Sequence, residues 1–166
     1  DFLKRFCEEH HPDAKADLAT AFVERCRGFA GDGQSYAILA PQNWLFLGLY
    51  ETMRKRFLVE QQWLHVSWLG PGAFRTISGE VVKPVLMILS NRQPQSDNTM
   101  TGIDATTEKS AAEKADLLKR GSFETISQQQ QIDNPDSRVT PRSQEAGRLL
   151  SEYAESYQGI CTGDYA

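Results

Sequence analysis

Residues 63–89 read WLHVSWLGPGAFRTISGEVVKPVLMIL, two apolar runs joined by a loop that contains glycine, proline and polar residues. The runs Trp63–Leu69 and Val81–Leu89 have the length of strands, and turn-forming residues bound them. Pro84 lies inside the second run, and because proline has no N–H group to donate, we expect a sheet edge or a bulge there. The segment therefore predicts two strands and a long connecting loop.

A third strand and two helices are predicted before this segment. Tyr36–Leu39 (YAIL) is a short apolar run between turn residues, typical of a buried strand. Asp13–Phe29 predicts an amphipathic helix, because four apolar side chains recur at helical spacing: Leu18, Phe22, Cys26 and Phe29. Residues 48–59 predict a second helix, whose run Arg54–Arg56 could meet phosphate but by default forms a solvated face.

The alternation of helices and strands over residues 1–90 predicts a parallel sheet covered by helices. Three strands are fewer than a doubly wound domain normally contains, so the sequence predicts a partial sheet with an exposed edge. Further along, residues 91–101 and 128–143 are polar and predict loops. Between them, Ser110 and Glu113 form a capping-box pattern that opens a helix, and Gly121 can close it.

Composition excludes some classes of protein. Apolar residues make up 40% of the 166 residues, but no apolar run approaches the ~18 residues that span a bilayer. The formal net charge of −4 does not favour a nucleic-acid-binding protein, although a local basic cluster would suffice for phosphate contacts. Three cysteines without CxxC spacing indicate a reducing, cytoplasmic setting. Because the chain begins with Asp1, we expect a processed chain or a piece of a longer one.

Few residues predict chemistry by spacing alone. No glycine-rich turn follows a strand and opens a helix, so neither a dinucleotide fingerprint nor a phosphate-binding loop is present. Cys7, His10 and His11 lie close together, but a zinc site needs four ligands and a polar helix end is the better interpretation. His65 is interpreted as a hydrogen-bonded strand histidine rather than a catalytic base. We therefore predict no metal site.

Phe74 lies in the loop between two predicted strands. Loops at strand ends of open α/β sheets often carry ligand contacts. The alternative, a hydrophobic plug beneath the loop, is favoured by residue type alone.

Six groups of residues follow one another in an order that a known family shares. They are Asp17–Phe22 with Glu24; Gly33–Pro41 with Asn43–Leu47; Tyr50 with Met53–Arg54 and Leu58; Leu69–Phe74 with Ile77–Val82; Lys114 with Asp116–Leu118 and Gly121; and Gln158–Gly159 with Thr162–Asp164. In this order the chain resembles the adenine-specific (N6) DNA methyltransferases, and most closely the phage-defence members of the BREX and PglX type and the restriction-linked members.

The resemblance implies an α/β fold, the C-terminal half of a class I (Rossmann-like) methyltransferase domain, with a partial sheet flanked by helices. Residues 1–92 would form this half, residues 93–150 an irregular α+β extension with one helix, and residues 151–166 the start of a target-recognition region. The family's glycine-rich turn for S-adenosylmethionine and its Asn-Pro-Pro-Tyr motif do not occur in the chain. We therefore expect no catalytic residues in it.

The resemblance also implies roles for particular residues. Phe74 would stack on a flipped adenine, an interaction worth ~1–3 kcal/mol. The other implied roles are a cofactor-pocket wall for Leu18 and Phe22, an active-site turn for Pro41 and Trp44, and a loop–strand junction for Gly79, Glu80 and Val81. Plain helix core for Leu18 and Phe22, and a structural junction at residues 79–81, remain open alternatives.

Two functions follow as expectations. In the first, the chain is an inactive fragment of a DNA adenine-N6 methyltransferase that uses S-adenosylmethionine and binds double-stranded DNA. In the second, it is a non-catalytic α/β scaffold or interaction module derived from a methyltransferase. Self-association through the exposed sheet edge could complete such a module.

Overall fold

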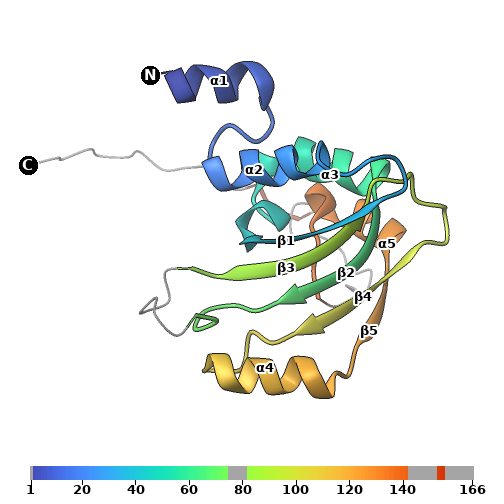
Figure 1. Ribbon diagram of the computed structural model, residues 1–166. Helices are drawn as coiled ribbons and strands as arrows, with labels where there is room; N and C mark the ends of the chain where they lie inside the picture. Colours follow the sequence, from blue (N-terminus) through green and yellow to red (C-terminus); the bar gives the residue numbers. More distant parts are fainter. Residues whose placement is uncertain (1, 75–81, 142–152, 156–166) are drawn as a thin grey trace, which may run out of the picture.

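The computed structural model describes residues 2–74, 82–141 and 153–155. One five-stranded sheet organises them, with the strand order β1-β3-β2-β4-β5 (Figure 1). Its strands are β1 (Ser35–Pro41), β2 (Gln62–Trp68), β3 (Pro84–Ser90), β4 (Thr99–Asp104) and β5 (Glu124–Ser127). Strand β3 runs antiparallel to β1 and β2, β4 runs parallel to β2, and β5 runs antiparallel to β4. The predicted mixed α/β class with an open, partial sheet is confirmed.

The prediction of a parallel sheet is wrong for most of the pairings. Among the described residues, only β2 and β4 pair in parallel. The reason lies in the strand order: β3 follows β2 in the chain and pairs directly beside it, and neighbours of this kind run antiparallel unless a crossover connection reverses the second strand. Strands β1 and β2 are joined through a helix and point the same way, but β3 lies between them.

Pro84 was expected at an edge or a bulge, and the structure places it elsewhere. It is the first residue of β3, an interior strand, opposite Pro41 at the end of β1. A proline at the first position of a strand interrupts few ladder hydrogen bonds, which explains why it is tolerated there. The bulge lies in β2 instead, between Trp63 and His65.

The helices are α1 (Phe2–His10), α2 (Leu18–Arg27), α3 (Glu51–Glu60), α4 (Ala111–Arg120) and α5 (Gln128–Asp133), with short 3-10 turns η1 (Gln42–Leu45), η2 (Gly48–Tyr50) and η3 (Pro135–Ser137). Side chains of α2, α3 and α5 pack into the core on one side of the sheet. Helix α4 lies beside the β5 end of the sheet, and α1 projects at the opposite end (Figure 1). No helix in the described ranges is long and apolar enough to cross a membrane.

Helix α2 forms as predicted, but it buries the opposite face. Asp17 caps it by accepting a hydrogen bond from the Ala19 N–H at 2.8 Å. The buried side chains are those of Thr20, Ala21 and Val23. Thr20 can be buried because its hydroxyl donates to the carbonyl oxygen of Ala14 at 2.7 Å. The predicted apolar stripe therefore faces outward, with Phe22 60% exposed.

The capping-box helix is confirmed in detail. Ser110 accepts a hydrogen bond from the Glu113 N–H, and the Glu113 carboxylate accepts one from the Ser110 N–H at 3.0 Å. Gly121 follows the last helical residue with a positive φ of 26°. Two segments predicted as loops are partly regular, because β4 begins at Thr99 and α5 covers Gln128–Asp133.

The core lies on the face of the sheet where β3 presents Val85, Met87 and Leu89, each with no exposed surface. The ring of Trp44 packs between those of Phe57 and Trp63, with ring centres 5.6 and 5.8 Å away. Each large apolar side chain buried in this way contributes about 1.5–3 kcal/mol. On the opposite face Ala37, Leu39 and Thr101 are exposed.

Candidate functional site

Three strands end at the same edge of the sheet, which we call the carboxyl edge. Strands β1, β2 and β4 point in one direction and end at Pro41, Trp68 and Asp104. Figure 1 shows this edge on the left, where the first residues after β2 also lie. Ligands of open α/β sheets usually bind beyond the carboxyl ends of the strands. The carboxyl edge is therefore the candidate site.

The loop that follows β2 carries Phe74 at this edge. Its first residue, Leu69, donates its N–H to the Pro84 carbonyl oxygen at 3.1 Å, so the loop starts from a fixed position. Gly70 and Gly72 have positive φ angles of 64° and 74°, which other residues rarely adopt. Phe74 is half-buried at the end of the described part of the loop. Intermediate burial fits either interpretation of Phe74, so the stacking role and the hydrophobic plug beneath the loop both stay predictions.

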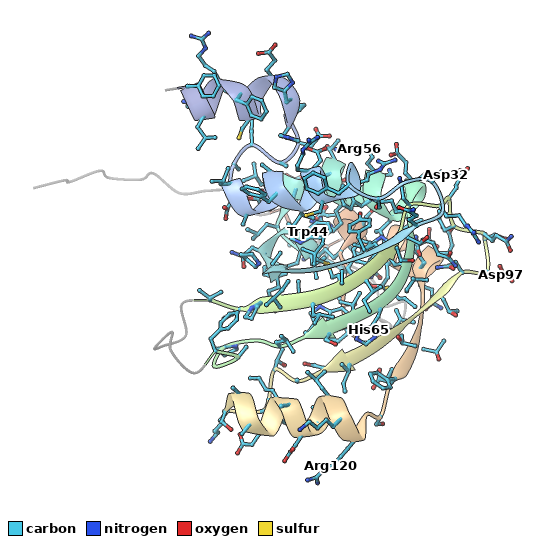
Figure 2. All side chains as sticks on the ribbon, in the orientation of Figure 1. Asp32, Trp44, Arg56, His65, Asp97 and Arg120 are labelled. Atoms are coloured by element: carbon cyan, nitrogen blue, oxygen red, sulfur yellow. The ribbon has the colours of Figure 1, made fainter. Side chains whose placement is uncertain are left out.

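The turn after β1 also lies at the carboxyl edge. The Gln42 N–H donates to the Lys83 carbonyl oxygen at 2.8 Å, which joins this turn to the start of β3. Pro41 is partly exposed, whereas Trp44 is fully buried in the core, where Figure 2 labels it. Trp44 therefore supports the turn from within, and the role of Pro41 and Trp44 in an active-site turn stays a prediction.

Arg54 holds the turn in place and was not expected to do so. Its side chain has no exposed surface. The guanidinium donates to the carbonyl oxygens of Trp44 at 2.7 Å and Leu47 at 3.0 Å. On its other side it donates to the carbonyl oxygens of Asp136 at 2.5 Å and Ser137 at 3.0 Å. Burial lowers the pKa of Arg54, and the nearby Asp136 carboxylate opposes this shift.

The assignment of Arg54 to a solvated helix face is therefore wrong. The sequence did carry a signal for its burial. Arg54 precedes Phe57 by three residues and Leu58 by four, so it shares a helix face with two core side chains. Arg56 fits the predicted face better, because it pairs with the carboxylates of Glu24 and, at 3.3 Å, Asp13.

Leu18 and Phe22 line an apolar groove between α1 and α2. They are 45% and 60% exposed, so the alternative of plain helix core is wrong. The groove has a volume of about 260 Å³ and is lined by Leu3, Phe6, Cys7, His11, Leu18, Ala21, Phe22 and Arg25. Figure 1 shows that α2 begins at the same end of the molecule as the carboxyl edge. Their role as a cofactor-pocket wall stays a prediction.

His65 is a hydrogen-bonded strand histidine, as predicted, and lies between β2 and β4 in Figure 2. Its Nδ1 lies 2.7 Å from the Thr101 hydroxyl oxygen, and its Nε2 lies 2.6 Å from the Ser67 hydroxyl oxygen. Thr101 donates its own proton to the Leu64 carbonyl oxygen, so it accepts from Nδ1–H, while Ser67 donates to Nε2. Burial lowers the pKa of His65 and favours this neutral form.

The remaining polar candidates have structural partners. His11 contacts the Glu24 carboxylate at 2.8 Å, which ties the α1–α2 connection to α2. Cys7 is buried. Within residues 2–74, 82–141 and 153–155, no three histidine, cysteine or acidic side chains gather as they would around a metal ion. Gly79, Glu80, Val81 and the Thr162–Asp164 motif lie outside the described residues.

Fold and candidate site together are those of part of an α/β domain whose carboxyl edge could bind a ligand. Solved structures with a similar fold include methyltransferase subunits. The methyltransferase subunit of a type I restriction-modification system from Streptococcus thermophilus has a TM-score of 0.57 at 21% identity, covering 76% of this chain and 30% of that one. This similarity shows that the chain has the fold of part of a methyltransferase domain.

Two sequence relatives are named adenine-specific methyltransferases. The adenine-specific methyltransferase BrxX of Escherichia coli O9:H4 (strain HS) is 33% identical over 89 residues, covering 54% of this chain and 7% of BrxX. The adenine-specific methyltransferase PglX of Lacticaseibacillus casei (strain Zhang) is 27% identical over 95 residues, covering 56% of this chain and 8% of PglX. No family model matches the sequence.

The predicted resemblance is thus confirmed: the chain is homologous to part of two adenine-specific methyltransferases. The match spans less than a tenth of the length of these relatives.

Proposed function

We propose that the chain is a segment of a site-specific DNA adenine-N6 methyltransferase that acts in phage defence or restriction-modification. The whole enzyme would transfer a methyl group from S-adenosylmethionine to an adenine flipped out of double-stranded DNA. The observation that carries the proposal is the homology to adenine-specific methyltransferases, combined with an aromatic loop at the carboxyl edge. A buried base cannot reach a methyl donor, so the enzyme must extrude it and support its face.

Phe74 is proposed as the platform for the extruded base. It is the aromatic residue of loop 69–74, and its half-buried position combines a fixed ring with an accessible surface. Any base can stack on such a ring, since each base has a π face. Pro41 would border the same space from the turn after β1. Gly79, Glu80 and Val81 are proposed to form the junction that returns the loop to β3.

The cofactor would be held only in part by this chain. Leu18 and Phe22 present apolar surface that suits the uncharged part of a nucleoside. The groove offers few polar groups to hold the charged end of S-adenosylmethionine, so the fit is that of one wall. The methyl group that S-adenosylmethionine supplies would be oriented by the glycine-rich turn and the Asn-Pro-Pro-Tyr motif on polypeptide outside this sequence.

The division of the chain belongs to the same proposal. Residues 1–92 would close the methyltransferase sheet, residues 93–150 would be a family-specific extension, and residues 151–166 would open the target-recognition region. In the structure the segment after residue 92 adds β4 and β5 to the same sheet. We also propose that the whole enzyme works in the cytoplasm, where DNA and S-adenosylmethionine are present.

The test is methyl transfer by the intact protein that carries this chain together with the two absent motifs. We expect the wild-type protein to methylate adenine in duplex DNA. Phe74→Ala should reduce turnover by about 10-fold or more, corresponding to the loss of one stacked base, whereas Phe74→Trp should be milder. Val59→Ala is the matched control, because this exposed residue lies at the end of α3, just before β2 begins at the opposite edge of the sheet. Equal and unchanged rates for Phe74→Ala and Phe74→Trp would remove the stacking role, and an inactive wild type would contradict the proposed function.

A further inference from the structure

The turn that follows β4, residues 105–109, packs directly against the loop that carries Phe74. The Ala105 N–H donates to the Trp68 carbonyl oxygen at 2.8 Å, at the point where that loop begins. A Cβ atom on Gly72 would lie 2.7 Å from the Lys109 carbonyl oxygen, and one on Gly70 would lie 3.0 Å from the Thr106 Cα. The two segments therefore meet backbone to backbone, with no room for a side chain between them.

Carboxylates fix both ends of this turn. At its start, Asp104 accepts hydrogen bonds from the Thr106 N–H at 3.0 Å and from the Thr106 hydroxyl at 2.6 Å. At its end, the Glu113 carboxylate accepts from the N–H groups of Lys109 and Ser110, each at 3.0 Å. The turn is thus a rigid surface, since its backbone groups are held from β4 and from the first turn of α4.

Lys114 attaches α4 to the first residue of the turn. It is the buried side chain of that helix, with 2% of its surface exposed. Its Nζ donates to the Ala105 carbonyl oxygen at 2.6 Å. Burial lowers the pKa of Lys114, and the Glu108 and Asp104 carboxylates oppose the shift. A buried ammonium group is costly unless it is hydrogen-bonded, so this contact accounts for the position of the helix.

Resting on the proposed function, we propose that residues 105–109, with Lys114 as a positioning residue, form a buttress for loop 69–74. The buttress keeps Phe74 in the orientation that receives the flipped base, without itself touching DNA. Through this buttress, the segment after residue 92 influences base binding, although its strand β4 lies on the other side of β2 from β3. A misplacement of a reacting group by about 1 Å can reduce a rate by about 100-fold, so a passive support can have a large effect on turnover.

The experiment compares variants of the intact methyltransferase. Gly72→Ala should push the loop away from Lys109, and Lys114→Met should release Ala105. Gly48→Ala and Gly33→Ala are the controls for the first. The Cβ added at Gly48 meets no atom within 4 Å, and Gly33 shares a positive φ, 71°, while its added Cβ meets nothing nearer than 3.5 Å. Lys119→Met, an exposed lysine on the same helix, is the control for the second. The readouts are single-turnover methyl transfer and the fluorescence of 2-aminopurine placed at the target adenine.

We expect Gly72→Ala and Lys114→Met to reduce the single-turnover rate by about 10- to 100-fold and to change the 2-aminopurine signal of the bound complex. Affinity for duplex DNA should stay near that of the wild type. Lys114→Arg, which keeps a donor, should restore part of the rate, a result that a general loss of stability would not give. Variants that match their controls in an active enzyme would overturn the proposal.

A second readout separates this inference from the proposed function. Hydrogen–deuterium exchange of residues 69–74 requires neither cofactor nor DNA. We expect faster exchange there in Lys114→Met than in Lys119→Met, while β3 stays protected. Equal protection overturns the buttress whether or not the wild type methylates DNA. If Lys114→Met does not fold, the comparison of Gly72→Ala with its two glycine controls gives the decision on the same grounds. If the wild type does not methylate DNA but residues 69–74 exchange faster in Lys114→Met, the proposed function is rejected and the buttress is supported.

Discussion

Buried cations and backbone carbonyls form the fixed points of the carboxyl edge. Arg54 joins the turn after β1 to residues 136–137, and Lys114 joins α4 to the turn after β4. Each cation can reach carbonyl oxygens that a helix or sheet leaves without partners. In the sequence both positions look like ordinary surface cations. Arg54 nevertheless contacts a residue more than 80 positions away along the chain.

Arg54→Met is predicted to destabilise the protein strongly. The substitution keeps the length of the side chain but removes this donor from the buried contacts to the Trp44 and Ser137 carbonyl oxygens and from the partly buried contact to that of Asp136. Because each buried group left unsatisfied costs about 1–3 kcal/mol, we expect the free energy of unfolding to fall by about 3 kcal/mol or more. Urea denaturation measures it, with exposed Lys55→Met as the control. A loss no larger than that of the control would contradict this account of Arg54.

Sequence reasoning at the residue scale succeeded where local chemistry is decisive. Ser110 and Glu113 were predicted as a capping box because a capping side chain acts within three residues of itself. It failed where a distant segment decides burial. Phe22 faces outward because Thr20 and Ala21, on the other side of α2, fit closely in the core, and helical spacing alone does not indicate which stripe the protein buries.

At the scale of elements, the sequence predicted three strands, and the two it missed share a weak pattern. Strand β4 reads TMTGID, in which Met100 and Ile103 are buried among polar or small residues. Strand β5 has four residues with Ile126 as its buried side chain. Such short, half-polar segments carry too little periodicity to be separated from loops. They become strands because β2 offers a hydrogen-bonding edge for β4 to pair with.

Strand β1 presents the opposite edge of the sheet, and this edge is predicted to drive self-association of the chain. Among the strands that the structure describes, β1 pairs with β3 alone, and Leu39 within β1 is 50% exposed. Exposed apolar edges tend to pair with another strand, and a lysine on them prevents it. Leu39→Lys should therefore shift the chain toward the monomer in sedimentation velocity, whereas Leu49→Lys, a similarly exposed control in η2, should not. Association unchanged by Leu39→Lys would show that this edge is not responsible.

At the scale of the whole molecule, the chain combines a complete local core with an incomplete site. The packed rings of Trp44, Phe57 and Trp63 in its core and the hydrogen bonds that hold its turns indicate a folded unit. The carboxyl edge, however, offers an aromatic loop and an apolar groove and lacks the motifs that hold a methyl donor. The resemblance in motif order implied a part of a methyltransferase, and the chain matches its methyltransferase relatives over less than a tenth of their length.

The most direct measurement is calorimetric titration of S-adenosylmethionine into the isolated chain and into the intact methyltransferase. The apolar groove of about 260 Å³ is smaller than the ~300–1,000 Å³ of typical ligand pockets and supplies one wall. We expect the intact protein to bind S-adenosylmethionine and the isolated chain to show no micromolar binding. Micromolar binding of S-adenosylmethionine by the isolated chain would contradict the account.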